Sequence, residues 1–402
     1  MHPRGPARRV RLRRLATGGR DGHGRPRGDA RAGVGLHGGP RAAHRGLVTK
    51  PTARVAFYYA VPAREPNDQT NPYGNLLADG LARVGVEVTY VDRHGEAWIR
   101  EHADDFDLMH WHWPAHEYHR ATTAETQAAM EAFVGELRLA RDLGWRLVWT
   151  VHNLYPHDRK YHDINREFRF RLVELSTALI AHCDLAAEAV SAEFHPRVPI
   201  HVIPHGNFID VLSATVTRAD ERAALGIPPD AFVYGFIGNL LPYKGLENLI
   251  DTFRAVDSGE AWMLISGGVE AEYRSHLRAY LADHPRIVLR TYDYAPGEAF
   301  VQVLEACDVI VLPFRASTTS GSLVQALSWP RPVIAPAIGC LPSQMSADAG
   351  ILYTPDEPGA LEVAMRRIRQ IDLGRARAAA WQSATSTDWD DIARRTLEAY
   401  LA

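Results

Sequence analysis

The sequence predicts an α/β protein with two Rossmann-like domains, and three observations support this fold class. The 402 residues exceed what one ordinary domain core holds. Short apolar runs that suit strands alternate with amphipathic segments that suit helices. This alternation runs twice along the chain, and the hinge between the two runs is predicted near residues 210–225.

The first run begins at about Arg54. Its predicted helices cover residues 74–84, 123–143 and 168–176. Its predicted strands cover residues 54–60, 86–91, 106–111, 146–151, 178–181 and 200–203. A strand, a loop, a helix and a second strand in this order are typical of the opening of a doubly wound domain. We therefore predict a first domain over residues 51–212.

The second run begins at Phe232. One predicted helix begins at residue 246, and two more cover residues 297–306 and 320–328. Two closing helices are predicted at residues 356–370 and 381–402. Its predicted strands cover residues 232–237, 261–266, 286–290, 309–314 and 332–335. We therefore predict a second domain over residues 213–380.

Residues 1–50 differ from the rest in composition. They hold 12 Arg and one Lys against two Asp, so with −3 overall the remaining chain carries a net charge of −14. We expect this tail to be disordered, or to precede a true start near Val48. A basic arm for anionic lipid or nucleic acid and a transit peptide are the alternatives. The acidic remainder argues against nucleic acid as a partner of the folded part.

The three cysteines, Cys183, Cys307 and Cys340, are far apart, lie beside apolar residues and form no CxxC pair. They predict buried free thiols in a reducing compartment. No apolar run approaches the roughly 20 residues that span a bilayer. We expect a cytoplasmic protein whose contact with a membrane, if any, is peripheral and at the inner face.

The segment GNLLPYKG, from Gly238 to Gly245, leaves a predicted strand and opens a predicted helix. A glycine at the strand end lets a ligand approach the backbone, and a helix N-terminus suits phosphate. Lys244 adds a positive charge for a diphosphate. A plain turn with a surface lysine is the alternative.

A second loop of this kind is LPFRASTTSGS, residues 312–322. Thr319 or Ser320 can cap the following helix, Gly321 and Ser322 offer further backbone N–H groups, and Arg315 can clamp a phosphate. A helix cap without a ligand is the alternative. Both loops follow strands of one predicted sheet, so we expect them to meet at the edge where open α/β sheets bind ligands.

Polar groups also follow two strands of the first domain. His152, His157 and Asp158 come after one strand and suit acid–base chemistry, although strand capping and solvation are alternatives. His110 and His112 alternate along the preceding strand and therefore share a face. We favour pocket lining over metal binding for this pair, because no third ligand is evident.

The segments FIGNLLPYKGLENLI, VWTVHNLYPHD, VIPHGNF, LPFRASTTSGSLVQALSWPRPVIAP and GILYTPDEPGAL together resemble GT-B glycosyltransferases. The resemblance is closest to bacterial family-4-like enzymes and xanthan-type β-mannosyltransferases, and it runs from about Arg54 to the C-terminus. It implies that residues 51–212 bind an acceptor and residues 213–380 a nucleotide sugar. It also implies that a C-terminal helix, residues 381–402, returns toward the first domain.

The resemblance implies roles for individual residues. His152 lies near the reacting sugar, and the donor is bound by Gly238, Lys244, Gly267, Gly268, Arg315, Ser320, Gly321 and Ser322. The acceptor side takes Asn71, Gly74, His110, His112 and Asn153. The chain departs from the family at two positions that often hold Glu, which here are Ser317 and Gln325. Where many members have an Arg shortly before the lysine, it has Asn239 and Leu241. Gln325 is expected to substitute for the missing carboxylate at the donor.

The implied activity is transfer of a hexose, of the mannose or glucose type, from a GDP- or UDP-sugar to an acceptor hydroxyl. The acceptor is a carbohydrate or a glycolipid. No cofactor or metal is expected, because cationic side chains and helix N-termini stabilise the leaving diphosphate. An inverting reaction takes its base from His152, His157 or Asp158, whereas in a retaining one the donor phosphate accepts the proton. Two alternatives are a non-catalytic partner subunit and an epimerase of nucleotide sugars.

Overall fold

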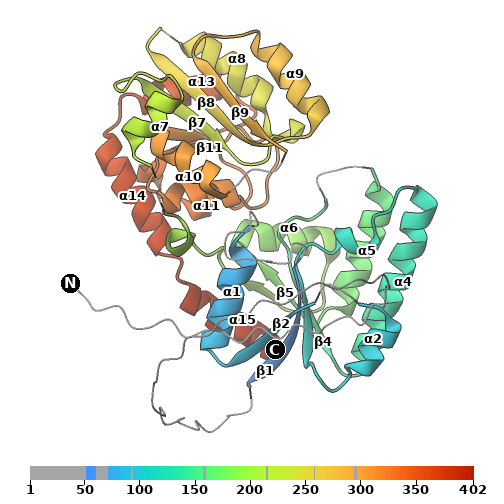
Figure 1. The fold of residues 1–402 in the computed structure, drawn as a ribbon. Helices are drawn as coiled ribbons and strands as arrows, with labels where there is room; N and C mark the ends of the chain where they lie inside the picture. Colours follow the sequence, from blue (N-terminus) through green and yellow to red (C-terminus); the bar gives the residue numbers. More distant parts are fainter. Residues whose placement is uncertain are drawn as a thin grey trace, which may run out of the picture.

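The computed structural model describes residues 51–59, 71–91, 94–156, 160–213, 216–257, 259–293 and 297–402. The predicted tail over residues 1–50 lies outside the described residues. In the described part the chain forms two lobes, each built on one parallel sheet (Figure 1). No described helix combines the length and the apolar character that crossing a bilayer needs.

The first sheet has six strands in the order β2-β1-β3-β4-β5-β6, and all its neighbours are parallel. Its strands are β1 (Ala53–Tyr58), β2 (Val86–Tyr90), β3 (Leu108–Trp111), β4 (Arg146–Thr150), β5 (Ala178–Ala181) and β6 (Ile200–Val202). The predicted strands all form, within two residues at each end. Because the strands are parallel, their carboxyl ends meet at one edge, and this edge carries the polar residues of the site.

Helices cover both faces of the first sheet. They are α1 (Tyr73–Arg83), α2 (Glu96–Glu101), α3 (Ala115–Tyr118), α4 (Thr123–Asp142), α5 (His162–Leu175) and α6 (Asp184–Phe194). Alternate residues of β1 point to opposite faces, so that Phe57 packs with α1 and Tyr58 packs with α4 and α5. Helix α4 begins at a capping box formed by Thr122 and Glu125, which supplies partners for two N–H groups of its first turn.

The second sheet also has six parallel strands, in the order β12-β11-β10-β7-β8-β9. Its strands are β7 (Phe232–Ile237), β8 (Ala261–Gly268), β9 (Ile287–Tyr292), β10 (Val309–Val311), β11 (Val333–Pro336) and β12 (Gly350–Tyr353). The sequence motifs did not reveal β12 as a strand. The predicted strand at 309–314 is shorter in the structure, since the chain leaves the sheet after Val311 and enters the phosphate-loop candidate.

The helices of the second lobe are α7 (Arg218–Ala224), α8 (Leu246–Val256), α9 (Ala271–Leu281), α10 (Gly297–Ala306), α11 (Gly321–Ser328), α12 (Leu341–Gln344), α13 (Ala360–Ile368) and α14 (Leu373–Thr385). Three short 3-10 turns complete the elements, η1 (Ile209–Val211), η2 (Pro242–Lys244) and η3 (Ala347–Ala349). One continuous core holds the lobe together.

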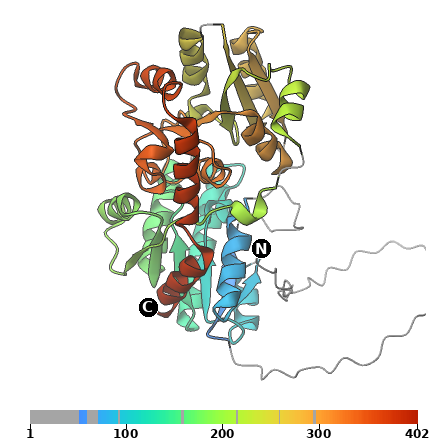
Figure 2. The same ribbon diagram turned by 90° about the vertical axis from the view of Figure 1, so that its left-hand side faces the viewer.

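The closing segment 381–402 is two helices rather than the single one predicted. Helix α14 ends at Thr385, and α15 (Trp389–Leu401) begins after Asp388, whose side chain accepts a hydrogen bond from the backbone N–H of Asp390. The break lets the chain pass from the second lobe to the first, where α15 lies beside α1 (Figure 2). The buried face of α15 carries Trp389 and Tyr400, which join the first lobe's core.

Hydrogen bonds fix this return of the chain. The Trp389 indole donates to the carbonyl of Asn207 at 2.7 Å, and the Asn207 amide donates to the carbonyl of Thr387 at 2.7 Å. Gly206 lies flat against the Trp389 ring, so close that a Cβ there would be 2.4 Å from it. The link between the lobes is therefore packed against the C-terminal helices.

Candidate active site

The two predicted phosphate loops lie together. They follow β7 and β10, which are neighbours in the second sheet. The backbone N–H of Arg315 donates to the carbonyl of Tyr243 at 3.2 Å. Gly245, at a positive φ of 72°, is in such close contact that a Cβ would lie 2.3 Å from the carbonyl oxygen of Pro313. The prediction that these two loops meet at one sheet edge is confirmed.

Lys244 and Ser322 converge on Gly238. A Cβ on Gly238 would lie 2.6 Å from the Ser322 hydroxyl and 3.1 Å from the Lys244 ammonium nitrogen. Among the described residues no carboxylate pairs with Lys244, and burial lowers the pKa of its ammonium to about 8. An anionic ligand stabilises such a buried ammonium, because its negative charge replaces the stabilisation by water that burial removed.

The rest of the second loop presents hydrogen-bond donors. The side chain of Ser320 caps α11 by accepting from the backbone N–H of Leu323 at 3.1 Å. Gly321 begins the helix, and the exposed Arg315 has no carboxylate partner in the part of the chain that the structure describes. The N-terminus of α11, which carries Ser322, therefore lies beside Lys244, and its first N–H groups add to the positive potential there.

The two positions at which the resemblance implies Glu differ in their surroundings. Ser317 donates its hydroxyl hydrogen bond to the carbonyl of Thr319 at 3.0 Å, within its own loop. Gln325 is half-buried on α11. Gly267 and Gly268 end β8 beside the first loop, and Gly268 accepts a hydrogen bond from the N–H of Leu240 at 2.8 Å. A Cβ on Gly267 would collide with the carbonyl of Gly238, so this glycine is required by packing.

A row of histidines lies along the corresponding edge of the first sheet. Neighbouring strands β3, β4, β5 and β6 are each followed within three residues by one histidine. These are His112, His152, His182 and His205, and all four are buried. Only the first two were predicted as site residues. The signal that would have found the other two is a histidine directly after each strand end, as at His152.

Three of these rings form a hydrogen-bonded chain. Nδ1 of His112 lies 3.0 Å from Nε2 of His152, and Nδ1 of His152 lies 3.2 Å from Nε2 of His182. Nδ1 of His182 donates to the carbonyl of Ile203 at 3.0 Å. The Trp113 indole stacks on His152 with a ring distance of 4.2 Å. Both nitrogens of His152 therefore face other histidines.

Burial favours the neutral form of these rings. It lowers the pKa of His182 to about 4 and of His205 to about 3, and it lowers the pKa of His112 and His152 well below the usual value. Neighbouring imidazoles add to the effect, because a charge on one ring disfavours a charge on the next. Among the described residues no group of three or more His, Cys, Asp or Glu side chains is arranged to hold a metal ion.

His110 shares the face of β3 with His112, as the alternation predicted, and their ring centres are 4.2 Å apart. Its own partners are structural. Nδ1 lies 2.7 Å from the Tyr400 hydroxyl of α15, and Nε2 lies 2.7 Å from the Thr150 hydroxyl. His110 thereby anchors the returning C-terminal helix to the first sheet.

The other predicted residues of the first domain are dispersed. Asn71 is exposed, and its side chain accepts from the backbone N–H of Tyr73 at the start of α1. Gly74 gives room to the Tyr59 ring, which would be 2.8 Å from a Cβ. Asn153 is half-buried next to His152. His157 and Asp158 lie outside the described residues.

The prediction of three free thiols is wrong for two of them. Cys183 and Cys340 form a disulfide, and only Cys307 is a free buried thiol. The two half-cystines are 157 residues apart, with Cα atoms 5.6 Å apart. Cys183 is the N-cap of α6 in the first lobe, and Cys340 is the N-cap of α12 in the second. The sequence gives no sign of this pairing because it depends on how the lobes face each other.

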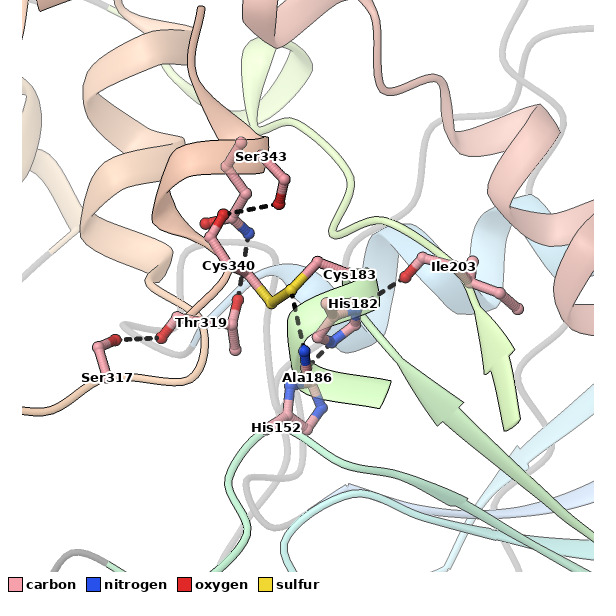
Figure 3. The surroundings of a disulfide bond; sticks show 10 residues. His152, His182, Cys183, Ala186, Ile203, Ser317, Thr319, Cys340 and Ser343 are labelled. Carbon is pink, nitrogen blue, oxygen red and sulfur yellow. Dashed lines mark hydrogen bonds between the residues drawn. A yellow bond between two sulfur atoms is a disulfide. The ribbon is translucent and has the colours of Figure 1, made fainter. Parts of the chain in front are cut away.

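The disulfide connects the two halves of the candidate site (Figure 3). Cys183 directly follows His182 of the histidine chain. The backbone N–H of Cys340 donates to the carbonyl of Thr318 in the second phosphate loop at 2.8 Å. The Gln344 amide donates to the Thr319 hydroxyl at 3.2 Å. A cavity of about 220 Å³ lies beside the disulfide and is lined by residues of both lobes.

Sequence comparison shows which known proteins the chain is similar to. Residues 231–370 match the family model of glycosyl transferases group 1. The chain is 28% identical over 298 residues to a GDP-mannose:glycolipid 4-beta-D-mannosyltransferase of Xanthomonas campestris pv. campestris, covering 72% of this chain and 76% of that protein. It is 26% identical over 328 residues to a D-inositol 3-phosphate glycosyltransferase of Corynebacterium urealyticum, covering 76% and 73%.

Solved structures share the arrangement of both lobes. Sucrose-phosphate synthase from Thermosynechococcus elongatus superposes with a TM-score of 0.65 at 18% identity, covering 87% of this chain and 98% of that one. Anabaena HepE, solved in complex with UDP-glucose, superposes with a TM-score of 0.65 at 17% identity, covering 86% and 98%. The chain therefore has the GT-B fold and is a glycosyltransferase, and residues 231–370 of its second lobe are similar to the group 1 glycosyl transferases.

Proposed function

We propose that this enzyme transfers a hexosyl group from a nucleoside diphosphate sugar to a hydroxyl of a carbohydrate or glycolipid acceptor. The second lobe binds the donor and the first lobe binds the acceptor. The observation that carries the proposal is the convergence of Lys244 and Ser322 on Gly238, beside the N-terminus of α11. Backbone N–H groups, a helix N-terminus and an unpaired cation are the groups that bind phosphate.

The same groups account for the chemistry of bond cleavage. When the bond between the sugar and the diphosphate breaks, negative charge develops on the leaving phosphate oxygens. Lys244, Arg315 and the first N–H groups of α11 stabilise that charge and act in place of a general acid. Burial lowers the pKa of the Lys244 ammonium to about 8. The negative charge of a bound diphosphate raises this pKa again and so favours the charged form of Lys244.

GDP-mannose and UDP-glucose are the first donors to test. The Xanthomonas relative is named for GDP-mannose, and Anabaena HepE was solved with UDP-glucose. Gln325, half-buried on α11, stands where many family members have a carboxylate. An amide both donates and accepts hydrogen bonds, so Gln325 is suited to a ribose hydroxyl or to a base edge.

The acceptor proposal extends to where the enzyme works. The Xanthomonas relative is named for a glycolipid acceptor, which supports peripheral contact with a membrane at its cytoplasmic face. Co-sedimentation with vesicles that carry a lipid-linked saccharide tests this extension. Binding to these vesicles and not to vesicles without the saccharide supports acceptor recognition, whereas no binding to either contradicts it.

The donor site is tested by nucleotide-dependent stability. GDP, UDP, ADP and dTDP are added to the wild type, to Lys244→Met and to Lys160→Met. Lys160 is an exposed lysine of the first lobe and serves as the matched control. A nucleotide at 100 times its Kd adds about 2.7 kcal/mol of stability, and a hundredfold weaker Kd leaves about 0.4 kcal/mol. We expect Lys244→Met to lose the stabilisation and Lys160→Met to keep it.

The remaining outcomes separate the alternatives. If every nucleotide leaves the wild type unchanged, the enzyme proposal fails and a non-catalytic partner subunit is favoured. If a nucleotide binds, incubation of the matching labelled sugar without acceptor is the next experiment. Formation of an epimer of the donor under those conditions identifies an epimerase and contradicts transfer.

A further inference from the structure

The histidine chain ends on a group that can only accept a hydrogen bond. Nδ1 of His182 lies 3.0 Å from the carbonyl oxygen of Ile203, which carries no proton. Nδ1 of His182 must therefore hold the hydrogen. In a neutral ring the other nitrogen, Nε2, is then a bare acceptor. This single contact sets the direction of every hydrogen bond that follows along the chain.

The direction passes from ring to ring. Since Nε2 of His182 accepts, Nδ1 of His152 must donate across the 3.2 Å contact, and Nε2 of His152 becomes an acceptor. Nδ1 of His112 then donates across the 3.0 Å contact. All three rings are fixed in the Nδ1–H form, and the one nitrogen left over is Nε2 of His112. That atom is buried and has no hydrogen-bond partner among the residues that the structure describes.

We infer that His182 is a positioning residue that, through the Ile203 carbonyl, holds His152 and His112 as Nδ1–H tautomers and so leaves Nε2 of His112 as the proton-accepting end of the chain. This inference rests on the proposed transfer to an acceptor hydroxyl. Because Nε2 of His112 is buried, the proton transfer requires one bridging water molecule between this atom and the acceptor hydroxyl, an arrangement that general bases use.

The acceptor oxygen forms a bond to the anomeric carbon, and the bond from that carbon to the diphosphate oxygen breaks with its electron pair. The hydroxyl proton passes to the bridging water, which gives one of its own protons to Nε2 of His112. The proton on Nδ1 of His112 can then move to Nε2 of His152, and that of His152 to Nε2 of His182, so three rings share one positive charge. After product release the proton returns to solvent.

The chain differs from a histidine backed by a carboxylate. A carboxylate stabilises the imidazolium by its charge, whereas the Ile203 carbonyl contributes orientation and a dipole. Besides burial, the charges that act on the pKa of His112 and His152 among the described residues are those of other histidines. Spreading the charge over several rings is the means of stabilisation that this arrangement offers.

The first experiment reads the tautomers directly. Long-range proton–nitrogen NMR correlation on ¹⁵N-histidine-labelled protein distinguishes Nδ1–H, Nε2–H and charged rings. The signals are assigned by the loss of one set of peaks in each single-histidine variant. We expect His112, His152 and His182 all in the Nδ1–H form. A wild type in which His152 is an Nε2–H tautomer or an imidazolium overturns the inference, whatever the variants do.

Variants separate positioning from packing. His182→Phe removes the acceptor, so His152 and His112 should lose their fixed Nδ1–H form. His182→Gln places an amide oxygen near the position of Nε2 and should restore it. His205→Gln is the control, because His205 packs against His182 at 5.5 Å between ring centres, whereas its hydrogen bond among the described residues goes to the Gly206 carbonyl. It should leave the tautomers unchanged, and tautomers that survive His182→Phe contradict the inference.

Kinetics supply the last comparison. With the donor that the stability assay identifies, His182→Phe should lower kcat by roughly 10²-fold, the lower range for loss of a general base, and leave KM for the donor unchanged. His182→Gln should recover most of that loss. Equal activity of His182→Phe and wild type overturns the inference. If no donor is transferred, the proposed function fails, whereas the tautomer pattern still tests the chain.

Discussion

Removal of the Cys183–Cys340 disulfide should lower the free energy of unfolding by up to about 5 kcal/mol. In the chain-entropy model a cross-link stabilises by restricting the unfolded chain, and the effect grows with the logarithm of the loop length. The separation of 157 residues gives about 5 kcal/mol at 25 °C, which is the upper end of what natural disulfides contribute. The same bond also restrains the two lobes relative to each other.

Urea unfolding with and without a reductant measures this contribution. The urea midpoint of the wild type should fall when reductant is added. Cys340→Ala should already have the lower midpoint without reductant, and adding reductant should not change it. Cys307→Ser is the control. Its cysteine is free and buried, so this variant should respond to the reductant as the wild type does.

Counting thiols tests the premise of the prediction. In denaturant without reductant, alkylation and mass spectrometry should find one modified cysteine, Cys307, and with reductant three. Three modified cysteines without reductant would refute the disulfide. A single modified cysteine combined with an unchanged unfolding midpoint upon reduction would instead refute the entropic reasoning. Protein taken directly from cells under alkylating conditions shows which state exists there.

Three further predictions concern glycine geometry, the C-terminal helix and pH. Gly238→Ala should cost about 1–3 kcal/mol of stability and weaken nucleotide binding, because φ is 117° and the new Cβ would meet the Ser322 hydroxyl; thermal unfolding with and without nucleotide checks it. Tyr400→Phe should cost about 1–3 kcal/mol in urea unfolding, because it removes the partner of Nδ1 of His110, and an unchanged midpoint would contradict this role. Acidification below pH 6.5 should lower the free energy of unfolding, since the unfolded chain then binds protons that the folded rings exclude. Each ring with a lowered pKa contributes a slope of up to about 1.4 kcal/mol per pH unit between pH 6.5 and its folded value, and urea titrations that are flat between pH 6.5 and 5 would contradict this. Burial lowers the pKa of His110 to about 3, of His182 to about 4 and of His205 to about 3, so these rings set the lower end of the pH range.

Local patterns in the sequence were enough for the architecture. Strand and helix periodicity, with glycines at the strand ends, predicted two doubly wound lobes and placed Lys244 six residues after Gly238 in a single loop. A phosphate loop can be recognised in this way because its residues are neighbours in the chain. Their mutual distance depends on a turn whose geometry is largely set by its own glycines.

Groups that come from different strands could not be found in this way. His112, His152 and His182 touch because β3, β4 and β5 lie side by side in the first sheet, and that order depends on how the whole sheet is assembled. The break between α14 and α15 likewise arises where the chain crosses between lobes.

The sequence by itself determined the fold class, the enzyme class and the loop around Lys244, because each rests on residues that are close in the chain. Only the tertiary structure decided that Cys183 meets Cys340 and that the histidines form a directed chain ending at Ile203. Both require knowledge of which strand ends and which lobes face each other. That information lies in the packing of segments that are between 30 residues (His152 and His182) and 157 residues (Cys183 and Cys340) apart in the chain, and no local periodicity carries it.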